Sequence, residues 1–228
     1  MDITLYYQEK GNKEPFILLH GNGQNGSYFK NQIDYFSNRY RVIALDTRGH
    51  GRSPRGTKPF TIEQFSCDLC DFMEELEISE AVILGFSDGA NIAMKFAMKY
   101  PNRVKALILN GGNLNPSGVK ITTQLPIEIG YKIAGRFASK SPEAKKNAEM
   151  LGLMVNDPNI ERNELSKITA PVLVICGRND IIRESHTKEI AKNIPNAKLS
   201  IIRGNHFIAN KRYIIFNKEV EDFLQNVR

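Results

Sequence analysis

Short apolar runs alternate with longer amphipathic stretches along most of this chain. The runs are rich in β-branched residues and leucine, as expected of strands that are buried on both faces of a sheet. Five of them are residues 16–19, 42–45, 81–84, 104–109 and 172–175. Residues 5–7 also indicate a strand, and a last strand at residues 198–202 is followed by a predicted terminal helix over residues 213–227.

The stretches between these runs carry helix signals. Thr61 and Gln64 have the spacing of a capping box, which predicts a helix from there to about Glu77. A second helix is predicted from Asp88 to about Lys99, because the Tyr-Pro pair that follows disfavours its continuation. The repeated strand–helix–strand order predicts an α/β protein with a mostly parallel, twisted sheet flanked by helices. Sheets of this kind bind ligands beyond the carboxyl ends of their strands.

The alternation breaks between about residues 113 and 169, where two stretches indicate helices and no strand pattern intervenes. We interpret residues 113–169 as a helical lid that lies over the carboxyl edge of the sheet. The remaining residues, 1–112 and 170–228, are then the α/β core. This organisation predicts one domain with a small insertion.

Each of the two lid helices has its own start signal. Pro126 is predicted to open the first, which then carries apolar residues at four-residue spacing, namely Ile129, Ile133 and Phe137. Ser141, Pro142 and Glu143 match the N-cap, the first and the second position of the other helix.

Composition fits an ordinary globular protein, with 228 residues, 25% of them charged and 41% hydrophobic. No apolar run approaches the ~18–20 residues that span a bilayer, and the first residues lack the basic and apolar regions of a secretion signal. We therefore expect a cytoplasmic protein without a membrane partner. The formal charge of +6 comes with no nucleic-acid-binding motif, so no nucleic-acid partner is expected, and the sequence leaves the oligomeric state open.

Three cysteines, an odd number, argue against a disulfide framework and fit a reducing compartment. Cys67 and Cys70 form a Cys-x-x-Cys pair, which can signal metal or redox chemistry. A tetrahedral zinc site needs four ligands, and the sequence holds no second pair of this kind. We interpret the pair as reduced thiols along a helix and expect neither a metal nor an organic cofactor.

Residues 85–89, Gly-Phe-Ser-Asp-Gly, match the Gly-x-Ser-x-Gly pattern of a nucleophilic serine. They follow a predicted strand directly and open a predicted helix, which is the context that the pattern requires. Such a turn strains the serine backbone and leaves no room for bulky side chains two residues before and after it, while the hydroxyl projects at the positive end of the helix. Ser87 is therefore the candidate nucleophile, and the alternative is a serine that only caps the helix.

With only four histidines, the general base can be sought by elimination. In this architecture the acid and the base follow the nucleophile along the chain, which leaves His186 and His206. His206 follows the last predicted strand and can reach the carboxyl edge, whereas His186 looks like the start of a surface helix. We predict that His206 is the general base. Asp180, in the loop after the preceding strand, is predicted to orient it; Glu184 is a weaker candidate, and the alternative for Asp180 is a turn residue.

A tetrahedral intermediate needs hydrogen-bond donors that are already in place for its negative charge. One is predicted to be the backbone N–H of Asp88, directly after the nucleophile. The other is assigned to the backbone N–H of Asn22, which lies between two glycines in the turn after an earlier strand. His20, which precedes that turn, is predicted to hold the loop by hydrogen bonds rather than to catalyse.

Together these motifs resemble the α/β-hydrolase superfamily over nearly the whole chain. The matching landmarks stand in the expected order, at residues 20–23, 46–53, 85–89, 177–180 and 205–206. The resemblance implies that residues 46–53, Asp-Thr-Arg-Gly-His-Gly-Arg-Ser, form a structural loop in which Arg48 is an ion-pair partner.

The Ser-Asp-Gly elbow is similar to that of valacyclovirase-like hydrolases of amino-acid esters, in which an acidic group can receive the ammonium group of the substrate. Asp88 also has a simpler role available, because an acidic residue in the first turn suits the helix dipole. The predicted lid favours the opposite charge, since residues 118–147 hold six basic and two acidic residues, a net charge of +4. A basic lid favours anionic or neutral substrates, unless its charges face only solvent.

The sequence therefore predicts a carboxylesterase-like serine hydrolase that cleaves a small carboxylic ester, or a thioester or amide, through an acyl-enzyme on Ser87. Two alternatives stay open. One is other chemistry on the same fold, such as C–C hydrolysis, perhydrolysis or acyl transfer, and the other is a ligand-binding member without catalysis. An intact set of nucleophile, base and acid argues against the second, since a protein that only binds has no need of an activated serine.

Overall fold

The computed structural model describes residues 2–227; residues 1 and 228, the outer ends of the expected core ranges, lie outside the described residues. The strands are β1 (Tyr7–Lys10), β2 (Glu14–Leu19), β3 (Tyr40–Leu45), β4 (Ala81–Phe86), β5 (Val104–Asn110), β6 (Val172–Asn179) and β7 (Ala197–Asn205). They form one seven-stranded sheet in the order β1-β3-β2-β4-β5-β6-β7. Strands β2 to β7 run parallel, and β1 pairs antiparallel with β3 at the edge.

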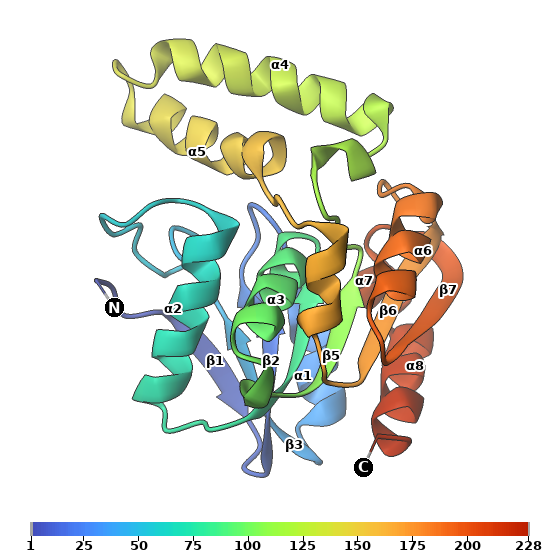
Figure 1. Cartoon of the computed structure of the whole chain (residues 1–228). Coiled ribbons are helices and arrows are strands. Elements are labelled where there is room, and N and C mark those ends of the chain that lie inside the picture. The colour runs from blue at the N-terminus through green and yellow to red at the C-terminus, as the bar shows by residue number, and fades with distance from the viewer. Residues whose placement is uncertain (1, 228) are drawn as a thin grey trace.

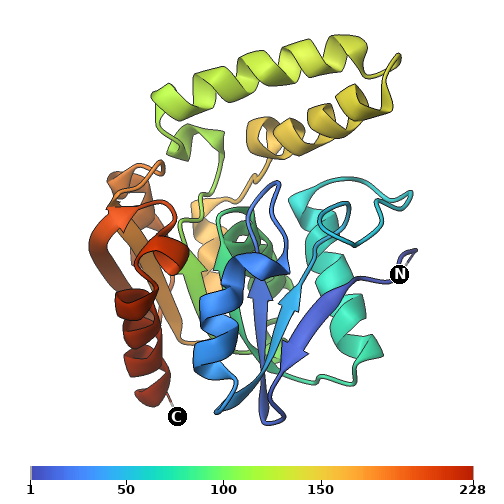
Figure 2. The same cartoon turned by 180° about the vertical axis from the view of Figure 1, so that it is seen from behind.

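Helices cover both faces of this sheet (Figures 1 and 2). On the face that Figure 1 shows lie α2 (Ile62–Glu75), α3 (Asp88–Lys99) and α6 (Glu184–Asn193). On the face that Figure 2 shows lie α1 (Lys30–Phe36), α7 (Ile208–Lys211) and α8 (Tyr213–Gln225). The sheet therefore has a hydrophobic core on each side, which explains why its central strands are apolar runs without polar alternation.

Strand β2 illustrates this double burial. Ile17 and Leu19 belong to the core beneath α2 and α3, while Phe16 and Leu18 belong to the core beneath α1 and α8. Successive side chains of a strand point to opposite faces, so an element buried on both faces must be apolar at every position. The predicted fold class, an α/β-hydrolase fold with a mostly parallel sheet flanked by helices, is confirmed.

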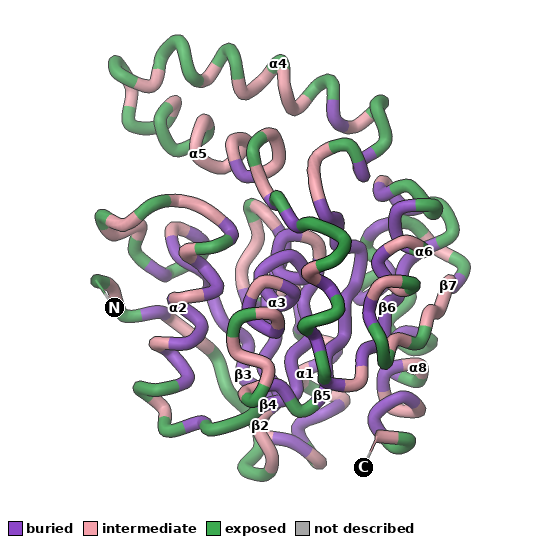
Figure 3. The backbone as a smooth tube through the Cα atoms, in the orientation of Figure 1, coloured by how far each residue is buried: buried purple, intermediate pink, exposed green. Residues whose placement is uncertain are grey.

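Two further helices, α4 (Ile121–Phe137) and α5 (Pro142–Asn156), form a hairpin above the carboxyl edge of the sheet. In both views α5 lies between α4 and the sheet (Figures 1 and 2). Short 3₁₀ helices are found at Gly26–Phe29, Pro101–Arg103, Pro116–Gly118 and Arg162–Lys167. The purple, buried part of the tube in Figure 3 is concentrated in the sheet and the helices packed on it, whereas α4 is mainly green and pink.

Most predicted elements are confirmed within a few residues. The Thr61 side chain accepts a hydrogen bond from the Gln64 amide at the start of α2, and the Ser141 side chain accepts one from the Ala144 amide at the start of α5. The terminal helix ends at Gln225, two residues before its predicted end. The cysteine pair lies on α2, and the three cysteines are free thiols, as predicted.

Two boundary predictions are wrong. The first strand begins at Tyr7 rather than at Leu5, because the Tyr6 amide donates to the Ser53 hydroxyl and the Tyr6 carbonyl accepts from Asp46, so this segment is tied to a loop instead of a strand. Pro126 does not open its helix but lies inside α4, which begins five residues earlier.

The helix continues through this proline. A proline removes one hydrogen bond to the carbonyl four residues before it, here that of Thr122. Both Pro126 and Thr122 are exposed, so water can bind the carbonyl that the helix leaves free. Of the helices within residues 2–227, none has the length and apolar character needed to cross a membrane.

Candidate active site

Ser87 lies in a strained turn between β4 and α3. Its φ of 53° and ψ of −119° fall in a region that residues other than glycine rarely adopt. A Cβ atom on Gly85 would lie 2.2 Å from the carbonyl oxygen of Gly89, and one on Gly89 would lie 2.0 Å from that of Leu19. The crowding expected of this motif is therefore present. Ser87 occupies the N-cap position, but its side chain makes no capping hydrogen bond, so the capping alternative has no support.

Asp180 and His206 meet at the carboxyl ends of β6 and β7. The Nδ1 atom of His206 lies 2.6 Å from Oδ1 of Asp180, and both residues are only 3% exposed. The Ile182 amide donates to the same carboxylate oxygen over 2.9 Å, which fixes its orientation. Because a carboxylate only accepts, Nδ1 carries the proton of this hydrogen bond, and Nε2 of the neutral ring is left with a lone pair that can take a proton.

Gly111, at the end of β5, makes room for this pair. Its φ is +66°, and a Cβ atom here would lie 2.8 Å from Cε1 of His206 and 3.4 Å from Oδ2 of Asp180. The imidazole therefore packs directly against the Gly111 backbone. Sequence reasoning missed this residue, and the only signal for it is a pair of glycines one residue after a predicted strand.

Phe86, the residue before the nucleophile, connects the serine turn to the histidine. Its ring centroid lies 4.8 Å from that of His206 and 4.6 Å from that of Tyr28, on which it stacks. The residue next to Ser87 therefore contacts His206, although the serine hydroxyl and the imidazole are not hydrogen-bonded to each other. Catalytic hydrogen bonds of this type commonly tighten only when substrate is bound.

The loop after β2 approaches the serine from the other side. A Cβ atom on Gly21 would lie 3.1 Å from Cβ of Ser87, so the backbone before Asn22 runs next to the nucleophile. Neither the Asn22 amide nor the Asp88 amide donates a hydrogen bond to another group within residues 2–227. Both N–H groups are therefore available to an oxygen atom bound at Ser87.

The Asn22 side chain has a second function that sequence reasoning missed. Its Nδ2 donates to Oδ2 of Asp88 over 3.0 Å and to the carbonyl oxygen of Met150 over 2.8 Å, which joins the loop to both the serine turn and α5. Asp88 is only 8% exposed, and burial raises its pKa to about 6, although the hydrogen bond from Asn22 acts in the opposite direction. Its carboxylate faces Asn22 rather than open solvent.

Two other histidines have structural roles. His20 donates from Nδ1 to the Gly21 carbonyl and accepts from the Thr47 amide at Nε2, which confirms its predicted role in holding the loop. Burial, followed by the neighbouring His50, lowers the pKa of His20 to about 3, so the ring is neutral at pH 7. His186 lies in the first turn of α6. It is buried, so the prediction that it lies on the surface is wrong, and its Nε2 accepts a hydrogen bond from the Leu114 amide over 2.9 Å.

Two charged residues that the sequence singled out, Arg48 and Glu184, lie outside this centre. Arg48 is fully buried and pairs with Asp2 and Asp68, as the family resemblance implied. Glu184, the weaker candidate for the acid, is exposed and pairs with Lys188 on α6. Within residues 2–227 the structure contains no group of three or more His, Cys, Asp or Glu side chains that could hold a metal ion.

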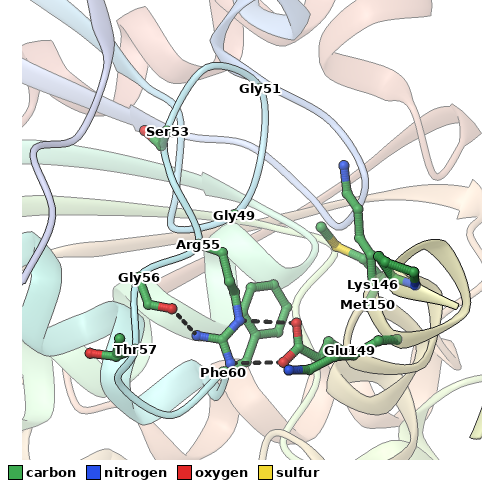
Figure 4. Close-up of a pocket in the computed structure, with 12 residues that line it drawn as sticks. Gly49, Gly51, Ser53, Arg55, Gly56, Thr57, Phe60, Lys146, Glu149 and Met150 are labelled. Carbon is green, nitrogen blue, oxygen red and sulfur yellow. Dashed lines mark hydrogen bonds and ion pairs between the residues drawn. The ribbon is translucent and has the colours of Figure 1, made fainter. Parts of the chain in front are cut away.

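A cleft of about 610 Å³ lies between α5 and the loop of residues 49–60 (Figure 4). Arg55 spans it and forms a two-pronged ion pair with Glu149 of α5, at 2.8 and 2.9 Å. Ser87, Asp180 and His206 do not line this cleft. Met150 borders it, and the carbonyl of the same residue accepts a hydrogen bond from Asn22, which connects the edge of the cleft to the loop next to Ser87.

Comparisons with known proteins agree with this fold. A family model described as "alpha/beta hydrolase fold" matches residues 14–136. Serine hydrolase BPHL from Homo sapiens is 27% identical, over 98% of this chain and 84% of its own, and 3-oxoadipate enol-lactonase 2 from Acinetobacter baylyi is 26% identical, over 96% and 92%. The crystal structure of the enol-lactonase from Burkholderia xenovorans LB400 superposes with a TM-score of 0.82 at 23% identity, covering 98% of this chain and 97% of that one.

Proposed function

The chain belongs to the α/β-hydrolase fold family, and from that membership we propose that it is a carboxylesterase-like serine hydrolase that cleaves a small carboxylic ester through an acyl-enzyme on Ser87. The observation that carries the proposal is the buried 2.6 Å hydrogen bond between His206 and Asp180 beside a serine in a strained turn. A serine with a purely structural role would not need a buried, hydrogen-bonded histidine and aspartate next to it. The relatives support the same chemistry, because one is named a serine hydrolase and another acts on a lactone, which is a cyclic ester.

The proposed reaction has two halves. Ser87 Oγ attacks the ester carbonyl while Nε2 of His206 takes its proton, and the amides of Asn22 and Asp88 hold the negative oxygen. The proton on His206 then passes to the departing alcohol, and the acyl group stays on Ser87. In the second half a water molecule gives its proton to His206, its oxygen attacks the acyl group, and the acid leaves as the proton returns to Ser87.

Asp180 acts through His206 in both halves. Its carboxylate keeps the proton of the ring on Nδ1, so that Nε2 faces the serine, and it stabilises the imidazolium that forms transiently. We assign the lid of this enzyme to the α4–α5 hairpin within residues 113–169. Free thiols fit the cytoplasm as the place where it works.

A fluorophosphonate probe tests the nucleophile. We expect wild-type protein to be labelled and to gain the mass of one phosphonyl group, and we expect Ser87→Ala to stay unlabelled. Ser166→Ala is the matched control, because that exposed serine bonds only to the Asn163 carbonyl and its loss should not affect labelling. Wild-type protein that stays unlabelled while a reference serine hydrolase reacts in the same tube would instead favour a protein that only binds ligands.

A substrate panel separates ester hydrolysis from other chemistry on this fold. The panel holds short-chain esters, a thioester, a β-diketone and a carboxylic acid with hydrogen peroxide. We expect the highest kcat/KM for an ester, with activity lost in Ser87→Ala. A diketone cleaved in preference to every ester would assign C–C hydrolysis instead.

A further inference from the structure

Helix α4 presents large apolar side chains to solvent. Five of them recur at four-residue spacing along its whole length, with exposed fractions of 50–61%: Ile121, Leu125, Ile129, Ile133 and Phe137. Residues four apart lie on one side of a helix, so these side chains form a continuous band, the apolar stripe of α4. Single exposed apolar residues are common in proteins, but contiguous bands of this kind mark interaction surfaces.

The stripe points away from the rest of the molecule. Two α4 residues form hydrogen bonds with α5: Gln124 donates to the Met154 carbonyl, and the Tyr131 hydroxyl accepts from Asn156. With 3.6 residues per turn, Tyr131 lies nearly opposite the stripe on the helix and Gln124 lies to one side of it. Because α5 lies between α4 and the sheet, the stripe faces outward and does not line the serine centre (Figures 1 and 2).

Positive charge lies along one edge of the stripe. Lys132 and Arg136 are exposed there and make no ion pair with a described residue, and Lys140 follows just beyond the end of the helix. The one acidic residue of α4, Glu128, lies four residues before Lys132 and therefore on the same side of the helix, but it is half-buried and accepts a hydrogen bond from Gln124. The exposed charges next to the stripe are therefore the cations Lys132, Arg136 and Lys140, and the one carboxylate of α4 is half-buried beside them.

We propose that the apolar stripe of α4 docks on an anionic lipid surface. Amphipathic helices of this composition lie in the plane of a membrane, with the apolar face in the boundary between headgroups and acyl chains and the cations at the anionic headgroups. This is a peripheral contact and needs no spanning helix. The expectation of no membrane partner rested on the absence of a spanning run, and a stripe shared between exposed positions of one helix escapes that criterion.

A second copy of the chain fits this face less well. Two α4 stripes in contact would bring the Lys132 and Arg136 side chains of both copies together, with the half-buried Glu128 as the one acidic residue that α4 offers them. The face also offers fewer than the about 20–30 residues a side that a standard protein interface uses. A lipid surface has neither difficulty, because it supplies negative charge and accepts a narrow apolar band.

Vesicle flotation tests the proposal with the full-length protein. We expect wild type to float with vesicles of phosphatidylcholine and phosphatidylglycerol and to stay behind with phosphatidylcholine alone. Ile129→Glu/Ile133→Glu should abolish binding, and Lys132→Glu/Arg136→Glu should weaken it by at least about 30-fold, since each cation near an anionic surface contributes roughly fivefold or more. All four side chains are exposed, so the fold should be retained, which a thermal melt checks.

Two matched variants control for lost hydrophobicity and lost charge. Ile214→Glu/Ile215→Glu changes two isoleucines that are 70% and 49% exposed on α8. Lys13→Glu/Lys198→Glu makes the same change of net charge near the amino ends of β2 and β7, at the opposite edge of the sheet from α4. Both variants should float like wild type.

Three results would overturn the proposal. The first is that wild type does not bind anionic vesicles. The second is that the α8 variant loses binding while the Ile129→Glu/Ile133→Glu protein keeps it. The third is a wild-type dimer in light scattering that the same α4 variant converts to monomer, which would assign the stripe to a second copy of this chain.

A fluorescence measurement gives an independent readout at the stripe. The chain contains no tryptophan, so Ile129→Trp is a unique reporter. We expect its emission to shift to the blue on adding the anionic vesicles, while Ile214→Trp on α8 keeps the emission of a solvent-exposed indole. An unchanged Ile129→Trp spectrum at lipid concentrations that float the protein would place the contact elsewhere.

Discussion

Gly111 is the residue on which the place of the His206 ring depends most directly. Any side chain there would push against the imidazole, because a Cβ atom would lie 2.8 Å from Cε1. Displacing a catalytic group by about 1 Å can cost on the order of 10²-fold in rate. We therefore expect Gly111→Ala to lower kcat for an ester by about that factor while KM changes little, and steady-state kinetics measure it. An unchanged kcat in a folded variant would show that the ring does not work from this position.

Asp180 should matter through the tautomer of His206 rather than through the fold. An asparagine can donate to Nδ1 and so favours the ring with its proton on Nε2, which cannot accept a proton from serine. We expect Asp180→Asn to lower kcat by about 10⁴-fold, as in other triads. Glu184→Gln, at the weaker candidate, is the control and should keep full activity. A large loss in the control together with a mild one at Asp180 would reverse the assignment.

Asp88 makes stability depend on pH. Its pKa is about 6 in the folded protein, against 3.8 for a free carboxyl, mainly because burial disfavours the charge. Between about pH 4 and pH 6 the folded state therefore holds more protons than the unfolded state. The free energy of unfolding then falls as pH rises through this window, by ~3 kcal/mol in total.

The variant Asp88→Asn removes this ionisation and keeps an acceptor for Asn22. We expect it to match wild type below about pH 4 and to become the more stable protein as pH rises to about 6, with a constant difference above that. Urea unfolding across this pH range measures the difference. A difference that does not vary with pH would show that Asp88 is not held in its neutral form by burial.

Chain order and motif context were sufficient to identify Ser87, Asp180 and His206 as candidates, because each follows a recognisable strand. The same reasoning could not identify Gly111 or the bridge from Asn22 to Met150. Both depend on how closely two segments far apart in the sequence approach each other. The sequence pattern indicates the order of strands and helices along the chain, but not how closely two distant segments approach each other in space.

At the level of elements, the link between α5 and the core rests on few polar contacts. Arg55 and Glu149 form the two-pronged ion pair across the cleft, and their side chains are 35% and 24% exposed. A partly exposed pair of good geometry contributes up to about 1 kcal/mol. We expect a double-mutant cycle with Arg55→Ala and Glu149→Ala to give a coupling energy of about 0.5–1 kcal/mol in urea unfolding. A coupling near zero would mean that the apolar contacts of α5 alone hold the hairpin down.

Element boundaries were harder to predict than element types. The pattern of Leu5 and Tyr6 is that of a strand, yet the hydrogen bonds of Tyr6 go to Ser53 and Asp46. Pro126 looks like a helix start, yet the helix continues through it because the carbonyl it leaves free is exposed. In both cases the outcome depends on hydrogen-bond partners that local sequence does not specify.

At the level of the whole molecule, the fold followed from the sequence because a parallel sheet buried on both faces has a distinctive apolar pattern. The sequence did not determine which side chains of the α4–α5 hairpin face the sheet and which face solvent. The sequence left open whether the six basic residues between 118 and 147 act on the substrate or face only solvent, and of these Lys132 and Arg136 are exposed on α4, which α5 separates from the sheet and the serine centre. Only Lys145 and Lys146 of that group line the cleft beside it.

The central claim is that three segments converge into one catalytic centre at the carboxyl edge of the sheet. A crystal structure of the protein after reaction with a phosphonate inhibitor tests it most directly. We predict phosphorus bonded to Ser87 Oγ, its oxygen within hydrogen-bond distance of the Asn22 and Asp88 amides, and Nε2 of His206 directed at the bound group with Asp180 still on Nδ1. An adduct on another residue, or a His206 ring turned away from an adduct on Ser87, would contradict the claim.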